Sequence, residues 1–169
     1  MLEVDLAQVM QGPVDTVAEV PPTDPLFQGL EFPPGDPVRV RGRLQSTGEG
    51  RYYWRATVAT VVAAECRRCL AAVRLPVSAQ VEALFTEAAD AEEDPAAYPI
   101  PHRAQHVDLK PAVREELILV VPAYVLCRDD CRGLCPRCGA DLNAGPCPCP
   151  PAEGDPRWES LRQTQSRLR

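Results

Sequence analysis

Eight cysteines are the residues of this chain whose type and spacing could do chemistry. Six lie between Cys127 and Cys149 with the spacing C-x3-C-x3-C-x2-C-x8-C-x-C, and Cys66 and Cys69 form a separate C-x2-C. This short spacing lets two thiolates converge on one tetrahedral zinc ion at about 2.3 Å. The segment 127–149 has too few apolar residues to build a core. A metal ion is therefore the expected source of its stability.

The simplest partition of the cysteines gives two closed sites with four thiolates each. One site, with a short zinc-ribbon pattern, takes the last four: Cys135, Cys138, Cys147 and Cys149. The other takes the remaining four: Cys66, Cys69, Cys127 and Cys131. Thiolate ligands favour structural zinc (Zn²⁺) over harder ions. Because Cys66 and Cys69 could instead be a free dithiol in a turn, the sequence predicts one or two zinc ions per chain.

Disulfides are the alternative use of an even number of cysteines. The first ten residues hold two acids, no base and no long apolar run, unlike a secretory signal. We therefore expect the protein to be cytoplasmic, where thiols stay reduced. Closely spaced cysteines also make strained bridges, which favours metal ligation. A redox role for Cys66 and Cys69 would need a helix N-terminus, and strands are predicted on both sides.

Arginines are the second chemical feature. The net charge is −6, but residues 39–74 carry eight arginines against two acids, while 1–38 and 75–102 contain acids and no Lys or Arg. Such segregation creates a local field that the net charge conceals. Arginine and aromatic side chains on a sheet bind phosphates and stack on unpaired bases. We therefore predict an RNA-binding face formed by Arg39, Arg41, Arg43, Arg51, Tyr53, Arg55, Arg67 and Arg68. The alternative is a solvated polar face balanced by the acidic flanks.

Catalytic motifs are not apparent. The chain has no glycine-rich phosphate loop and no hydrolase serine motif, and His102 and His106 have no obvious third ligand. The sequence thus predicts a non-enzymatic protein with no small-molecule substrate. The longest apolar run, 117–127, is interrupted by Pro122 and is too short to cross a bilayer, so no membrane partner is expected.

The predicted fold class is α+β: an antiparallel β-meander with one packed helix, a C-terminal zinc-ribbon-like module and a short terminal helix. Period-two alternation predicts strands over 38–44, 52–64 and 73–85, and helical spacing follows Asp108 as N-cap. The expected parts are a mainly β domain with a basic sheet face (1–85), an acidic proline-bearing loop (86–105), a helix packing on the sheet (106–123), a cysteine-rich zinc module (124–151) and the terminal helix (152–169).

The register of the first hairpin decides which side chains share a face. A loop at 48–50, with its last glycine left-handed, pairs Leu44 with Trp54 on one side and Arg43 with Arg55 on the other. The register that makes one face apolar therefore makes the other face rich in arginine.

The third strand begins just after the C-x2-C pair, which places that pair in the turn between the two longest strands. Pro76 within this strand cannot donate to a ladder, which predicts an edge position or a ladder site that needs no donor. The short segments 2–6 and 14–20 are candidates for additional strands.

Four ordered motifs cover about the last two thirds of the chain: CRRCL (66–70), DLKPAVREELILVVP (108–122), LCRDDCRGLCPRCGADLNAGPCPC (126–149) and DPRWESL (155–161). In this combination the chain resembles the bacterial YceD family, the large ribosomal RNA subunit accumulation proteins. The resemblance implies a cytoplasmic, non-enzymatic factor that supports accumulation or processing of large-subunit ribosomal RNA. Some members lack most of the C-terminal cysteines, which implies that Cys66, Cys69 and the arginines around them are closer to the shared activity.

Together these observations predict a ribosome-biogenesis factor that binds large-subunit RNA or a precursor particle through 39–74, with ribosomal proteins as further partners. The alternative is a protein adaptor that recruits a ribosomal protein or an RNA-processing enzyme without touching RNA. Salt dependence separates the two, because only phosphate contacts release counterions. A zinc-bearing transcription regulator would need a basic recognition helix, for which only the short terminal helix is available.

Overall fold

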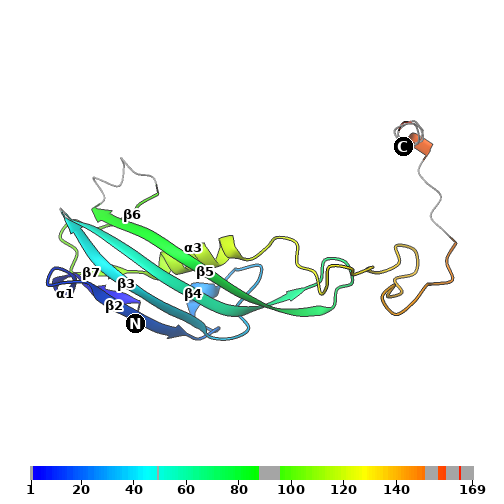
Figure 1. Ribbon diagram of the computed structural model, residues 1–169, viewed down its shortest axis with the longest axis horizontal. Coiled ribbons are helices and arrows are strands. Elements are labelled where there is room, and N and C mark those ends of the chain that lie inside the picture. Colours follow the sequence, from blue (N-terminus) through cyan, green and yellow to red (C-terminus); the bar gives the residue numbers. More distant parts are fainter. Residues whose placement is uncertain (1, 49, 88–95, 151–155, 159–163, 165–169) are drawn as a thin grey trace.

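A long five-stranded sheet is the main element of the computed structural model, which describes residues 2–48, 50–87, 96–150, 156–158 and 164 (Figure 1). Its strand order is β2-β3-β4-β5-β6. The strands are β2 (Val14–Val20), β3 (Val38–Gly48), β4 (Arg51–Glu65), β5 (Ala72–Glu87) and β6 (Tyr98–Ile100). The first four are antiparallel, and β6 runs parallel to the end of β5, so the sheet is mixed.

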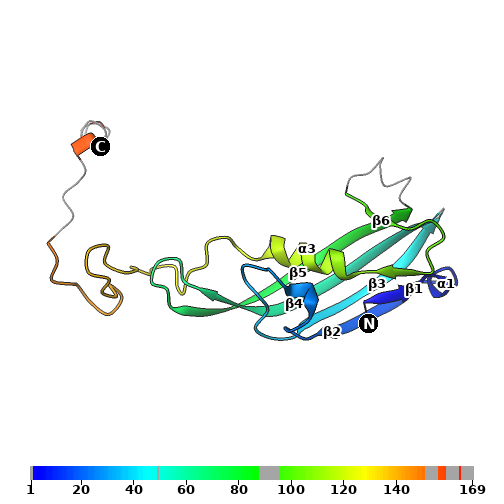
Figure 2. The same cartoon turned by 180° about the vertical axis from the view of Figure 1, so that it is seen from behind.

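A small second sheet, a helix and a 3-10 turn lie over one face of this sheet (Figure 2). A second, two-stranded sheet joins β1 (Glu3–Asp5) to β7 (His106–Asp108). The helical elements are α1 (Leu6–Val9), the 3-10 turn η1 (Pro25–Phe27), α3 (Lys110–Val120) and the 3-10 turn η2 (Pro156–Trp158). Among the described helices, none has the length and apolar character needed to cross a membrane.

The hydrophobic core lies between the inner face of the sheet and α3. Alternate residues of β3 and β4 point inward, and Leu44 and Trp54 are fully buried there. From the helix, Val113 is fully buried and Leu117 nearly so, in the same apolar cluster. Burial of one such side chain contributes about 1.5–3 kcal/mol. The intervening residues of β3 and β4 point to the outer face, where the described part of the chain leaves polar side chains exposed.

The hairpin register is confirmed. Leu44 pairs with Trp54 and Arg43 with Arg55, as the alternation predicted. The loop is one residue shorter than expected, because Gly48 already pairs with Arg51 and the ladder shifts just before it. The last loop glycine is left-handed, with a φ of 72° at position 50.

The meander prediction is correct for β3, β4 and β5 but incomplete. Residues 14–20 extend the sheet as β2, whereas the segment at 3–5 belongs to the second sheet. Residues 86–105, expected to be a loop, contain the end of β5 and all of β6, and 88–95 lie outside the described residues. Since β6 pairs only with 85–87, Pro76 lies on a part of β5 without a second neighbouring strand among the described residues, as an edge proline should.

The predicted helix at 106–123 begins later than expected. Its first residues form β7, and α3 starts at Lys110. The expected N-cap, Asp108, still serves the helix start, because its Oδ1 accepts a hydrogen bond from the Lys110 backbone N–H at 3.0 Å. The helix ends before Pro122, as predicted. Of the terminal helix expected at 152–169, only 156–158 and 164 are described, and 156–158 form a 3-10 turn.

Candidate metal centres and arginine face

Four cysteines converge at the tip of the β4–β5 hairpin, and we call this group the first centre. Cys66 and Cys69 come from the turn of the hairpin, and Cys127 and Cys131 from the segment after α3 (Figure 1). The Cys66 and Cys131 sulfurs are 3.8 Å apart and the Cys69 and Cys127 sulfurs 3.6 Å. Thiolates placed about 2.3 Å from a tetrahedral zinc lie about 3.8 Å from one another. All four sulfurs lie within 4.8 Å of one another, so the group fits one metal ion.

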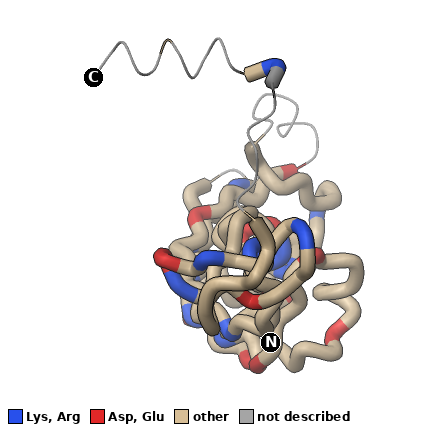
Figure 3. Tube along the Cα trace, turned by 90° about the vertical axis from the view of Figure 1, so that its right-hand side faces the viewer, with Lys and Arg blue, Asp and Glu red and all other residues tan. Residues whose placement is uncertain are grey.

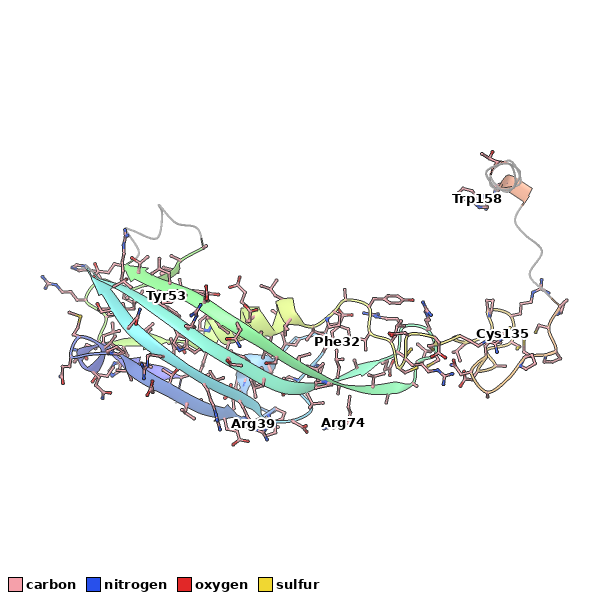
Figure 4. The ribbon with its side chains drawn as sticks, viewed as in Figure 1. Phe32, Arg39, Tyr53, Arg74, Cys135 and Trp158 are labelled. Carbon is pink, nitrogen blue, oxygen red and sulfur yellow. The ribbon has the colours of Figure 1, made fainter. Side chains whose placement is uncertain are left out.

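The other four cysteines form the second centre, farther from the sheet. Figure 4 labels one of them, Cys135, beyond the hairpin tip. The members are Cys135, Cys138, Cys147 and Cys149, and their sulfurs again lie within 4.8 Å of one another. All eight cysteines are free thiols. The structure therefore brings together the two groups that the spacing predicted, and each could hold a metal ion such as zinc.

The C-x2-C turns of the two centres have the same backbone geometry. In each turn the N–H of the first cysteine, Cys66 or Cys135, donates at 2.8 Å to the carbonyl five residues later. The residue after the second cysteine, Leu70 or Gly139, donates at 2.9 Å to the carbonyl of the first. This residue is left-handed in both, with φ of 61° and 72°. Both turns are therefore cysteine knuckles of one kind, although only the second has glycine where glycine is favoured.

The first cysteine of each knuckle is acidified. Burial raises the pKa of the Cys66 thiol, but backbone N–H groups, that of Cys127 foremost, outweigh burial and bring the pKa to about 6. In the second knuckle, backbone N–H groups, that of Cys138 foremost, bring the pKa of Cys135 to about 6. Because metals bind the thiolate form, these turns prepare a ligand at neutral pH.

The left-handed position gives a test of the knuckle geometry. Gly139→Leu is expected to lower the stability of the metal-loaded module by about 1–2 kcal/mol, the cost of a left-handed residue with a side chain. Leu70→Gly, the reverse change in the first knuckle, should not destabilise the folded form. Thermal unfolding with saturating zinc measures both. Ala140→Leu is the matched control, because the neighbouring residue is exposed and not left-handed. Equal losses in Gly139→Leu and Ala140→Leu would contradict the assignment.

The predicted RNA-binding residues fall in two places. Six lie on the outer face of the sheet, where alternation places them: Arg39, Arg41, Arg43, Arg51, Tyr53 and Arg55. In Figure 4 Arg39 and Tyr53 lie on β3 and β4, toward opposite ends of the sheet. The other two, Arg67 and Arg68, lie in the first knuckle.

Carboxylates from the neighbouring strands pair with part of the outer face. Arg43 donates to Asp15 of β2 at 2.7 Å, and Arg55 donates to Glu82 of β5 at 2.9 Å. The hydrogen bond from each guanidinium holds the pKa of its carboxyl partner below the usual range. Figure 3 shows basic and acidic residues interspersed along the described chain. On the outer face, therefore, arginines occupy β3 and β4, and acids on β2 and β5 flank them on both sides.

The remaining arginines differ in their partners. Arg39 lies 3.9 Å from Glu19, a long ion pair. In the part of the chain that the structure describes, Arg41 and Arg51 have no carboxylate partner, and both are exposed. Tyr53, two residues after Arg51 on β4, is half-buried. The open cationic area is thus smaller than the sequence suggested.

The two arginines of the first knuckle contact segments that are distant in the sequence. Arg67 pairs with Glu31, and its guanidinium lies 5.6 Å from the centre of the Phe32 ring. Arg68 donates to the backbone carbonyl of Cys131 at 2.8 Å. Sequence reasoning did not identify these partners, since they come from segments 35 or more residues away.

Comparison with known proteins gives a family match. The family model described as the large ribosomal RNA subunit accumulation protein YceD matches residues 54–164. An uncharacterized protein of Mycobacterium tuberculosis (strain H37Rv) is 34% identical over 124 residues, covering 70% of this chain and 58% of that protein. One of Mycobacterium leprae (strain TN) is 30% identical over 132 residues, covering 75% and 58%. The chain thus spans less than two thirds of the length of these curated relatives. No solved structure matches.

Proposed function

The chain belongs to the YceD family, and from this we propose that it is a non-enzymatic factor supporting the accumulation or processing of large-subunit ribosomal RNA. It acts by binding RNA or a precursor of the large subunit through the outer face of the five-stranded sheet. The observation that carries this proposal is the uncovered face itself. Its two central strands bear five arginines and an aromatic side chain: Arg39, Arg41, Arg43, Arg51, Arg55 and Tyr53.

The flanking acids restrict how a polyanion can lie on this face. Asp15 and Glu82 on the outer strands repel phosphate, so an RNA strand follows the axis of β3 and β4. The Arg43–Asp15 pair is exposed, with 60% and 67% of the two side chains accessible. Exposed pairs of this kind stabilise the fold little, so a phosphate can take the place of the carboxylate. Arg41 and Arg51 have no carboxylate partner among the described residues and need no such exchange there. Tyr53 offers a ring for stacking on an unpaired base.

Zinc has a structural role in this proposal. A zinc ion with four thiolates carries a net charge of about −2, and thiolates select zinc over harder ions. Several arginines surround the two centres and offset this charge: Arg67, Arg68, Arg128, Arg132 and Arg137. Arg67 and Arg68 thus support the metal module, and the sheet arginines contact RNA.

Removal of Arg41 and Arg51 tests the RNA contact. Arg41→Ala with Arg51→Ala is expected to weaken binding of single-stranded large-subunit RNA about tenfold at 0.1 M salt. It should also flatten the plot of log affinity against log salt by about 1.4, since each single-strand phosphate contact contributes about 0.7. Filter binding over a salt series measures both quantities. The control, Arg103→Ala with Lys110→Ala, removes the same charge at two exposed residues outside β3 and β4. Equal effects of the two pairs would contradict a specific face.

A protein adaptor is the second candidate, and one observation favours it. An apolar groove of about 150 Å³ lies beside the end of α3, lined by Leu30, Glu31, Phe32, Leu117, Ile118, Val121 and Ala123. Leu119 and Tyr124 are exposed on the same segment. An adaptor would retain no RNA at physiological salt yet still copurify with a ribosomal protein. Ile118→Asp would abolish that copurification and leave RNA binding unchanged.

A further inference from the structure

We propose that the two metal centres are coupled through Asn143. Filling the second centre holds this side chain where it stabilises a thiolate ligand of the first, so the two ions bind cooperatively. The inference rests on the metal binding proposed above and adds a positioning residue that is not itself a ligand.

Asn143 belongs to the second centre by sequence and contacts the first. It lies in the loop between Cys138 and Cys147, two ligands of the second centre. Its side-chain Nδ2 donates to the sulfur of Cys131, a ligand of the first centre, at 3.5 Å. This is the distance expected for an N–H donor and a sulfur acceptor. A hydrogen bond to a ligating sulfur supports the thiolate form and orients it toward the metal.

The Asn143 amide has no hydrogen-bonding capacity left over. Its Oδ1 accepts from the Arg132 backbone N–H at 2.8 Å and from the Arg128 side chain at 2.8 Å. Its Nδ2 donates to Asp141 Oδ1 at 2.7 Å as well as to the Cys131 sulfur. An amide provides two donors and two acceptor sites, and all four are used. The amide is therefore fixed in orientation and fastens the segment 128–132, which carries Cys131.

Backbone contacts join the same two parts of the module. The N–H of Leu134 donates to the Arg68 carbonyl in the first knuckle at 3.1 Å. Gly133 beside it has a φ of 73°, and a Cβ there would lie 2.9 Å from the same carbonyl. The N–H of Leu142, next to Asn143, donates to the Gly133 carbonyl at 2.9 Å. The loop of the second centre is thus packed directly on the knuckle of the first.

Cooperativity follows from this arrangement. The loop that carries Asn143 is closed at its two ends by Cys138 and Cys147, so an ion in the second centre lowers the entropy cost of placing the amide on Cys131. Outer-sphere partners of this kind change metal affinity by about 10–100-fold. By thermodynamic linkage, the factor by which an ion in the second centre strengthens binding at the first equals the factor by which an ion in the first strengthens binding at the second.

Cadmium-113 NMR of the full-length protein tests the coupling, because each tetrathiolate centre gives its own signal. Affinities are obtained for each centre by competition with a chelator. Asn143→Ala is expected to weaken cadmium binding at the first centre about tenfold. Cys147→Ser with Cys149→Ser, which disables the second centre, should weaken the first by a similar factor. Adding Asn143→Ala to that variant should cause little further loss, since one interaction cannot be removed twice.

Asn143→Asp sharpens the test, because it keeps an oxygen for Arg132 and places a carboxylate against the thiolate. It should weaken the first centre at least as much as Asn143→Ala, whereas Ala144→Ser in the same loop should have no effect. Unchanged first-centre affinity in Asn143→Ala, or additive losses in the combined variant, would overturn the coupling. A wild-type protein that binds no cadmium would instead overturn the metal proposal. If the serine variants fail to fold, the comparison of Asn143→Ala with Ala144→Ser decides alone.

Discussion

Treatment of the purified protein with EDTA is expected to unfold residues 124–150 and leave the five-stranded sheet intact. This segment contains no helix and no strand beyond the bridge of Leu134 with Asp141. Only Val125, Cys131, Cys135 and one glycine are buried in it, too little for a hydrophobic core. A structural zinc ion contributes about 10–16 kcal/mol at neutral pH, which is enough to decide whether such a segment folds.

Hydrogen exchange measured by mass spectrometry follows this unfolding segment by segment. After chelation, amides of 124–150 should exchange fully within the shortest labelling time, and those at the hairpin tip, 66–71, should lose protection with them. Amides of β3 and the N-terminal half of β4 are the internal control and should stay protected. Retention of protection in 124–150 without metal would show that something other than metal folds the module.

The second large effect is expected in the sheet. Trp54→Ala should lower the free energy of unfolding by about 3–5 kcal/mol, the usual range for removing a fully buried aromatic side chain. Trp54 is fully buried, lies opposite Leu44 and Ala83, and donates from Nε1 to the Thr16 hydroxyl at 2.9 Å. From β4, Trp54 therefore contacts residues of β3, β5 and β2. Equilibrium unfolding in urea measures the loss.

A double-mutant cycle separates the hydrogen bond from the packing. Thr16→Val leaves the buried Trp54 Nε1 without a partner and should cost about 1–3 kcal/mol. Trp54→Phe removes the donor, so the Thr16→Val change should cost less in that background. A Trp54→Ala protein with less than about 1 kcal/mol of lost stability would contradict the position of this side chain in the core.

The sequence predicted the parts of the fold that local patterns determine. Period-two alternation and a glycine turn are sufficient to align β3 with β4, and Arg43 lies opposite Arg55 as expected. The grouping of the cysteines followed from knuckle spacing in the same way. By contrast, β6 and β7 have three residues each, too few to show a period.

The charge of the arginine face could not be predicted from composition. Counting residues 39–74 alone gave a strongly basic segment, but the sheet places β2 and β5 on either side of it. The acids that meet Arg43 and Arg55 come from 28 and 27 residues away. The sequence contains one indication of acids on this face: Asp15 and Glu19 are four residues apart and so point to the same side of β2. Only the register of β2 with β3, a long-range property, shows which arginines they meet.

The role of Asn143 also could not be predicted from the sequence, because it depends on a long-range contact. Asn143 is an ordinary turn residue by sequence, in an Asp-Leu-Asn stretch between ligands. Its role depends on the second centre lying against the first, where its amide meets Cys131. Spacing shows which residues can bind a metal, and the outer contacts that orient them depend on tertiary packing.

Crosslinking of the tagged protein to RNA in living cells, followed by sequencing of the attached RNA, tests the central proposal most directly. We expect large-subunit ribosomal RNA or its precursors to be enriched over an untagged control, and the enrichment to fall in the variant with Arg41→Ala and Arg51→Ala. The Arg103→Ala and Lys110→Ala variant should match the wild type. Absence of ribosomal RNA from the crosslinked material, with a ribosomal protein still copurifying, would contradict direct RNA binding by this face.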